Sequence, residues 1–304
     1  MTTRRVRMNI KTKNRIFNLI NHGFLSLALV IVLVPLLHMV AASFSDPAAV
    51  TGGRVGIFPV DFTILGYQTI FEDKEIWIGY RNTVLYTVTG TALSTVLTML
   101  AAYPLSRTDF KPRNFFMKLF TFTMFFGGGL IPTYLLVKNL KLLDTMGAII
   151  LPGAVSAYNI ILARTFIQSN VPRELLEATQ IDGCDDFRFF RMFVIPLTKP
   201  IIAVVSLFCA VGIWGSYFSA MIYLSNPKLY PLQIYLRDIL ISNQVNANTL
   251  AQGMAGAESM AAKQSIQELL KYSLIIVSSV PVLCIYPFIQ KYFVRGVMLG
   301  SIKG

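Results

Sequence analysis

The sequence predicts an all-α, polytopic membrane protein with six transmembrane helices. Hydrophobic residues make up 54% of the 304 residues, charged residues make up only 14%, and the mean hydropathy is +0.59. This composition is too apolar for a soluble chain of this length. An apolar stretch of about 20 residues can cross roughly 30 Å of hydrocarbon. We expect spans near residues 17–42, 78–104, 115–137, 145–167, 199–223 and 268–292.

A basic arm, residues 1–16, precedes the first expected span. Most of the 27 Lys and Arg residues lie in this arm, in the connections after the second and fourth spans, and in the tail. Because Lys and Arg gather on the cytoplasmic side of membrane proteins, both termini are expected in the cytoplasm. The membrane domain then covers residues 17–292, and residues 293–304 form a cytoplasmic tail. The first apolar run is too long for a secretory signal core, so we expect it to stay as a span. Short basic loops explain the net charge of +12, and no nucleic-acid partner is expected.

Glycine interrupts the third expected span. Gly127, Gly128 and Gly129 are followed by Pro132, and this run weakens a helix and frees backbone groups. Broken helices are tolerated where their backbone lines a cavity or is buried in protein. Gly128 and Gly129 are therefore candidates for lining a path through the membrane, with close helix packing as the alternative.

Polar and aromatic residues interrupt the fourth and fifth expected spans. Asn159 lies in the fourth, and Trp214 and Tyr217 in the fifth would share one face of a continuous helix. These three residues are candidate contacts for a solute. Bundle packing and interhelical hydrogen bonds are the alternative explanation.

The connection between the fourth and fifth spans, residues 170–200, is amphipathic and lies on the basic side. Pro172 suits a first helical turn, Gly183 can end a helix, and Asp185 or Asp186 can cap a second short helix. The second helix would carry two apolar rows: Phe187, Phe190 and Val194 on one face, and Phe189 with Phe193 on another. We expect a helix, a turn and a helix, with one row facing the membrane domain and the other facing a docked protein.

Several motifs are missing from the sequence. No Asp or Glu lies inside an expected span, whereas ion-coupled carriers usually keep ionisable groups there. The phosphate-binding loop G-x-x-x-x-G-K-[ST], H-E-x-x-H and G-x-S-x-G are absent too. Cys184, Cys209 and Cys284 have no metal-ligand spacing. We therefore expect a chain that is not an enzyme and binds no metal or cofactor.

Residues 174–200 resemble the coupling loop of permease subunits of binding-protein-dependent ABC importers. The pattern E-A-A-x-x-D-G-A, followed by F and L-P-L, is matched by Glu177, Ala178, Thr179, Asp182, Gly183, Phe190 and Pro196. Thr179, Cys184 and Ile195 depart from it by small or isosteric changes. The chain is most similar to the carbohydrate-uptake group that includes the smaller maltose permease subunit. The run FFGGGLIP resembles permeases for larger oligosaccharides.

The resemblance implies a type I ABC importer permease fold with cytoplasmic coupling helices, in the bacterial inner membrane. It implies a second permease subunit, two cytoplasmic ATPase subunits and an extracytoplasmic sugar-binding protein as partners, and ATP and Mg would be bound by the ATPase. Glu177 would pair with a basic group in an ATPase groove, unless it only favours its own helix N-terminus. Gly300, Ser301 and Lys303 of the tail would lie between the ATPase subunits. The polar connection 224–267 would reach toward the binding protein, or act only as a linker.

Other function classes account for less of the sequence. An ion-coupled secondary transporter explains the spans but not residues 170–200, and an ABC permease for another cargo explains both. A membrane-embedded enzyme needs catalytic groups that the sequence lacks. Aromatic faces and amides such as Trp214, Tyr217 and Asn159 suit a sugar ring.

Overall fold

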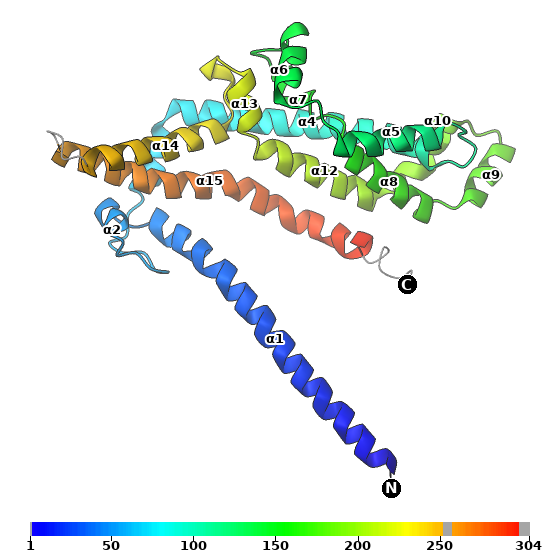
Figure 1. Ribbon diagram of the computed structural model, residues 1–304, viewed down its shortest axis with the longest axis horizontal. Helices are drawn as coiled ribbons and strands as arrows, with labels where there is room; N and C mark the ends of the chain where they lie inside the picture. Colours follow the sequence, from blue (N-terminus) through cyan, green and yellow to red (C-terminus); the bar gives the residue numbers. More distant parts are fainter. Residues whose placement is uncertain (1, 252–256, 298–304) are drawn as a thin grey trace. The chain divides into compact units, whose positions relative to one another are not determined.

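The computed structural model describes residues 2–251 and 257–297 of the chain. Within these residues the regular structure is entirely helical, which confirms the predicted all-α class (Figure 1). The helices form two compact units, Met1–Glu72 with Ile239–Val277, and Asp73–Asp238 with Ser278–Gly304. Two long helices, α14 (Leu232–Ala251) and α15 (Ala257–Val297), contribute to both units.

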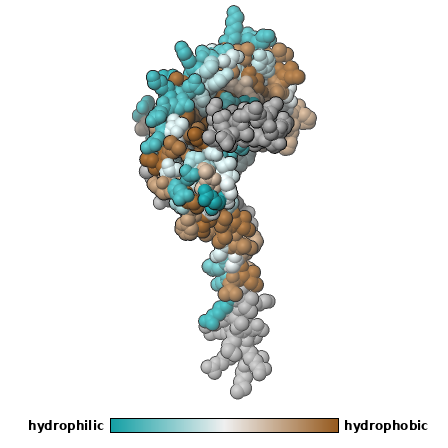
Figure 2. Space-filling view, turned by 90° about the vertical axis from the view of Figure 1, so that its left-hand side faces the viewer, coloured by the Kyte–Doolittle hydropathy of each residue, from teal (hydrophilic) through white to brown (hydrophobic). Residues whose placement is uncertain are grey.

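The first unit contains α1 (Thr2–Ser43), α2 (Pro47–Thr51) and α3 (Leu65–Glu72). The expected span 17–42 is confirmed as a helical, apolar segment, Phe17–Ser43. Its apolar side chains are exposed over most of its length, and they appear brown in Figure 2. Such a surface needs lipid or another apolar partner around it.

The second unit is built around α4 (Lys74–Ser106), which packs against α8 (Ala157–Asn170) and α12 (Lys199–Trp214) (Figure 1). The remaining elements are α5 (Arg113–Phe125), α6 (Leu130–Asn139), α7 (Met146–Ile150), α9 (Arg173–Ile181), α10 (Asp186–Phe189), the π-helix η1 (Phe190–Val194), α11 (Ile195–Leu197), α13 (Phe218–Tyr223) and the 3-10 helix η2 (Pro227–Leu229). Its main core joins α4, α8 and α12 to the segment Asp186–Leu197. The packing therefore ties the predicted coupling loop to the membrane helices.

Three described helices are long and apolar enough to cross a membrane: Phe17–Ser43, Lys74–Ser106 and Gln264–Ile285. Two bent pairs raise the number to as many as five. The chain bends by 113° between Arg113–Phe125 and Leu130–Asn139, and by 80° between Asp186–Leu197 and Lys199–Trp214. The predicted break in the third span is confirmed, whereas the count of six spans stays a prediction.

The expected fourth span, residues 145–167, is not one helix. It consists of α7, residues 151–156 without helix, and α8. Pro152 and Gly153 lie in the gap. Proline has no backbone N–H to donate to a helix, and glycine favours irregular backbone. At 1.5 Å per residue, the 14 residues of α8 reach about 21 Å, less than the roughly 30 Å of hydrocarbon.

The expected fifth span, residues 199–223, is also divided. Helix α12 ends at Trp214, with Gly215 as its C-cap, and α13 begins only at Phe218. Glycine is a poor helix former, which explains the stop at this position. The prediction of one continuous helix over these residues is therefore wrong.

Candidate functional site

Helix α9 carries the first half of the predicted coupling motif. It follows Pro172, and Glu174 lies in its first turn. Arg173 Nε donates to Glu177 Oε1 over 2.8 Å, and both side chains are exposed. An exposed pair of this spacing stabilises a helix by only about 0.3–0.5 kcal/mol. Glu177 is thus charged, exposed and held by a contact that a stronger basic partner can replace.

The other residues of the motif on α9 divide between surface and core. Ala178 is exposed, whereas Thr179 is buried. The Thr179 hydroxyl donates to the carbonyl oxygens of Leu175 and Leu176 over 3.0 and 2.9 Å. Its polar atom is therefore satisfied inside the helix, and its methyl group packs where the family pattern has Ala.

Gly183 ends α9 in a left-handed turn, as predicted. Its φ is +76°, its N–H donates to Gln180 O over 3.0 Å, and Cys184 N–H donates to Thr179 O over 2.9 Å. These two bonds define a Schellman motif, with Asp182 as the C-cap. No described atom lies within 4 Å of the place that a Cβ on Gly183 would take. The turn requires glycine for its backbone angle and not for space.

The second helix, α10, is capped by Asp185, which is one of the two predicted caps. The Asp185 carboxylate accepts from Arg188 N–H over 2.8 Å. Helix α10 then runs into the π-helix η1, whose wider turns place Phe189 and Val194, five residues apart, on the same buried side. Phe189 is only 2% exposed, whereas Phe187 is 70% exposed. The predicted row of Phe187, Phe190 and Val194 is therefore wrong, because it assumed α-helical spacing.

Two large apolar side chains stand out from this loop on either side of the Gly183 turn. Ile181 is 87% exposed, and Phe187 is 70% exposed. Pro196 is exposed as well, and Phe190 is half buried with its ring 5.2 Å from that of Tyr103. Ile181 is not among the residues predicted from the sequence, although an isoleucine between polar residues at a helix end is a visible signal. Several large apolar side chains are exposed on this one loop, which makes it a candidate surface for a partner protein.

A cleft of about 460 Å³ lies beside α9. The end of α4 and the following connection line one side with Tyr103, Arg107 and Asp109, and α9 lines the other with Glu177 and Gln180. Hydrogen bonds with Asp109 raise the pKa of Arg107, and bonds with Arg107 lower the pKa of Asp109. Both groups are therefore charged at neutral pH, and the cleft is walled by fixed charges of both signs.

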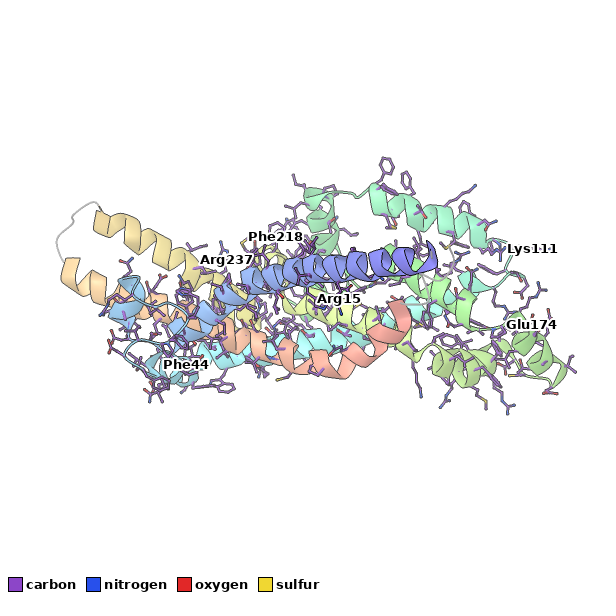
Figure 3. The ribbon with its side chains drawn as sticks, turned by 90° about the horizontal axis from the view of Figure 1, so that it is seen from below. Arg15, Phe44, Lys111, Glu174, Phe218 and Arg237 are labelled. Carbon is purple, nitrogen blue, oxygen red and sulfur yellow. The ribbon has the colours of Figure 1, made fainter. Side chains whose placement is uncertain are left out.

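This cleft lies at one end of the second unit. In Figure 3, Lys111 of the α4–α5 connection and Glu174 of α9 lie at that end, and Arg237 of α14 lies near the other. The basic connections and the coupling motif thus share one end, as expected from the sequence.

The glycine run between α5 and α6 is open. Gly129 has a φ of +83°, and no described atom lies within 4 Å of a Cβ built on Gly127 or Gly129. A Cβ on Gly128 would meet only Pro132, at 4.0 Å. Close packing of these glycines against another described helix is therefore wrong as an explanation, and their role as path lining stays a prediction.

The other candidate path residues are in different environments. Asn159 is buried, and its Nδ2 donates to Cys209 Sγ over 3.5 Å. Trp214 is 8% exposed, and its Nε1 donates to Ser278 O over 2.9 Å. Tyr217 is exposed and lies beyond the end of α12, so the shared helix face expected for Trp214 and Tyr217 does not exist. Burial and hydrogen bonding favour packing for Asn159 and Trp214.

Gly300, Ser301 and Lys303 lie outside the described residues. Within residues 2–251 and 257–297, no group of three or more His, Cys, Asp or Glu side chains is arranged to hold a metal ion.

The chain belongs to the family of binding-protein-dependent transport system inner membrane components, whose model matches residues 94–299. The polygalacturonan/rhamnogalacturonan transport system permease protein YtcP of Bacillus subtilis (strain 168) is 41% identical over 294 residues, covering 96% of this chain and 100% of the relative. Protein LplC of the same organism is 38% identical over 290 residues, covering 95% of this chain and 96% of the relative.

A solved structure has the same fold. It is the crystal structure of a bacterial ABC transporter involved in the import of the acidic polysaccharide alginate, and the matching chain has a TM-score of 0.80 and 34% identity, covering 92% of this chain and 98% of that chain. These comparisons confirm the resemblance inferred from the coupling-loop residues. The chain is a membrane permease subunit of an ABC importer.

Proposed function

We propose that this chain is one of two permease subunits of an importer for oligosaccharides, and that residues 170–200 dock on a cytoplasmic ATPase subunit. The exposed pair Ile181 and Phe187 carries this proposal. Both side chains flank a rigid, glycine-dependent turn, and both belong to a loop whose opposite side is buried against α4, α8 and α12. A groove on a partner can therefore receive one side of the loop while the membrane helices hold the other.

The topology completes the proposal. Six spans in the inner membrane, with both termini inside, place the basic connections in the cytoplasm, where Glu177 meets a basic group of the ATPase. ATP and Mg bind to that ATPase. The tail residues Gly300, Ser301 and Lys303 contact the same subunits, and the connection 224–267 faces an extracytoplasmic binding protein.

The proposed cargo is an oligosaccharide released from an acidic polysaccharide. Its support is the cargo named for two similar proteins, polygalacturonan/rhamnogalacturonan for one and the acidic polysaccharide alginate for the other. Gly128 and Gly129 are proposed to line the path, because an open backbone in the hydrocarbon region needs water or protein beside it. Asn159 and Trp214 are proposed to support the path by packing.

The test is uptake by proteoliposomes that contain this chain, its partner permease and the ATPase, with the binding protein outside. We expect import of labelled oligogalacturonides only when ATP is inside, and little import of neutral oligosaccharides of equal length. Import driven by a proton or sodium gradient without ATP would establish a secondary transporter instead. ATP-dependent import of the neutral sugars alone would overturn the acidic cargo but leave the importer intact.

A further inference from the structure

Arg107 joins the end of α4 to the coupling loop. It is the C-cap of α4, and its side chain is only 11% exposed. Its Nε donates to Asp109 Oδ1 over 2.9 Å, and its Nη1 donates to the Tyr103 hydroxyl over 3.1 Å. The same Nη1 is paired with the carboxylate of Asp186, the first residue of α10. One planar guanidinium thus holds a membrane helix, the connection after it and the second helix of the loop in a fixed geometry.

The end of α4 is also held from the other side of the loop. Arg164 Nε of α8 donates to Leu105 O over 2.9 Å, and Gln168 Nε2 of α8 donates to Ser106 O over 3.1 Å. These bonds satisfy carbonyl groups that the end of a helix leaves without partners. The two helices that flank α9 in the sequence, α8 before it and α10 after it, therefore both form polar contacts with the same end of α4.

Helix α9 packs on the same core through Leu175 and Leu176. Its polar residues Glu177 and Gln180 instead line the cleft, together with Arg107 and Asp109 at the end of α4. The polar link from the loop to the end of α4 is therefore made by α10, where Asp186 pairs with Arg107 and where the Phe190 ring lies 5.2 Å from Tyr103.

We infer that Arg107 is a positioning residue that transmits movement of the coupling loop to α4 through Asp186. This inference rests on the proposed function of the loop. A role in stability alone is a poor explanation of the pair, because the charge of Arg107 is already paired with Asp109 and the Asp186 carboxylate is largely exposed. The pair instead fixes where α10 lies against α4.

The test compares Asp186→Asn with Asp73→Asn in the reconstituted complex. Asp186→Asn removes the charge that Arg107 holds across the loop and keeps the size of the side chain. Asp73 caps the opposite end of α4, where its carboxylate accepts from Glu75 N–H over 2.8 Å, and asparagine caps a helix equally well, so Asp73→Asn is the matched control. Arg107→Lys is a second variant, because lysine keeps the charge but cannot hold several carboxylate and hydroxyl partners in a plane.

Two quantities are measured: ATP hydrolysis stimulated by the loaded binding protein, and sugar imported per ATP hydrolysed. We expect Asp186→Asn and Arg107→Lys to lower the import per ATP several-fold and to weaken the stimulation of hydrolysis by the binding protein, with normal yield of complex. The control should match the unchanged protein. A lower yield with unchanged import per ATP in the surviving complexes would overturn the inference. Unchanged stimulated hydrolysis together with unchanged import per ATP would overturn it as well. Failure of the proposed function is distinct, because the unchanged complex would then show no ATP-dependent import at all.

Discussion

Gly183 shows how one residue decides the shape of the loop. Its φ of +76° lies in the left-handed region, which costs other L-residues roughly 1–2 kcal/mol and β-branched residues more. We expect Gly183→Val to distort the turn between α9 and α10 and to abolish stimulated ATP hydrolysis. Asparagine tolerates this backbone region, so Gly183→Asn is the matched control and should keep most activity. Equal activity of the two variants in purified complexes would show that the turn is not required.

A substitution at Trp214 distinguishes a role in packing from a role in contacting the substrate. Its burial and its bond to Ser278 O predict that Trp214→Ala costs about 3–5 kcal/mol of stability and lowers the yield of complex. Tyr217→Phe, at an exposed residue, should leave the yield unchanged. The measurements are complex yield and uptake per complex. Normal yield of Trp214→Ala with selectively reduced uptake per complex would restore the contact hypothesis.

For single residues, the sequence predicts those structural roles that depend on neighbouring residues along the chain. Gly183 at the end of α9 and a capping aspartate before α10 follow from local rules. The pairing of Arg107 with Asp186 and that of Trp214 with Ser278 do not, because the two partners lie far apart in the sequence. Only the fold brings these groups together.

Among the elements, the break between α5 and α6 has the clearest consequence for transport. If Phe126–Gly129 borders a water-filled path, a cysteine at Gly128 should react with a polar, membrane-impermeant thiol reagent, and bound cargo should slow the reaction. The experiment uses a chain in which Cys184, Cys209 and Cys284 are first replaced by serine, and that chain without the new cysteine is the control. No reaction at Gly128 in complexes of normal yield would mean that protein or lipid covers the break.

The elements also show where periodicity misleads. The glycine run was recognised as a break because glycine and proline act locally. The division of residues 145–167 was missed because its apolar composition hides Pro152 and Gly153. The π-helix η1 leaves no pattern in hydrophobic spacing because it is a single wide turn. The sequence therefore predicts Phe187 and Val194 on one face, whereas Val194 is buried with Phe189 and Phe187 is exposed.

For the whole molecule, exposed apolar surface predicts dependence on a partner permease. Phe125, Phe126 and Ile131 are strongly exposed around the α5–α6 break, where lipid cannot satisfy open backbone groups. We expect the chain to be degraded rapidly when expressed alone and to be stabilised by co-expression with the second permease subunit, as measured by pulse-chase. A long-lived homodimer that imports sugar at full rate with two ATPase subunits would contradict this expectation.

Docking of residues 170–200 on the ATPase is the central claim, and it can be measured by placing a photo-crosslinking amino acid at Ile181, which is 87% exposed at the end of α9. The control position is Phe58, which is also strongly exposed but belongs to the connection expected on the outer side. The account predicts a covalent adduct with the ATPase subunit from position 181 and none from position 58. Complexes of normal yield that give no ATPase adduct from position 181, or give one from position 58, would contradict it.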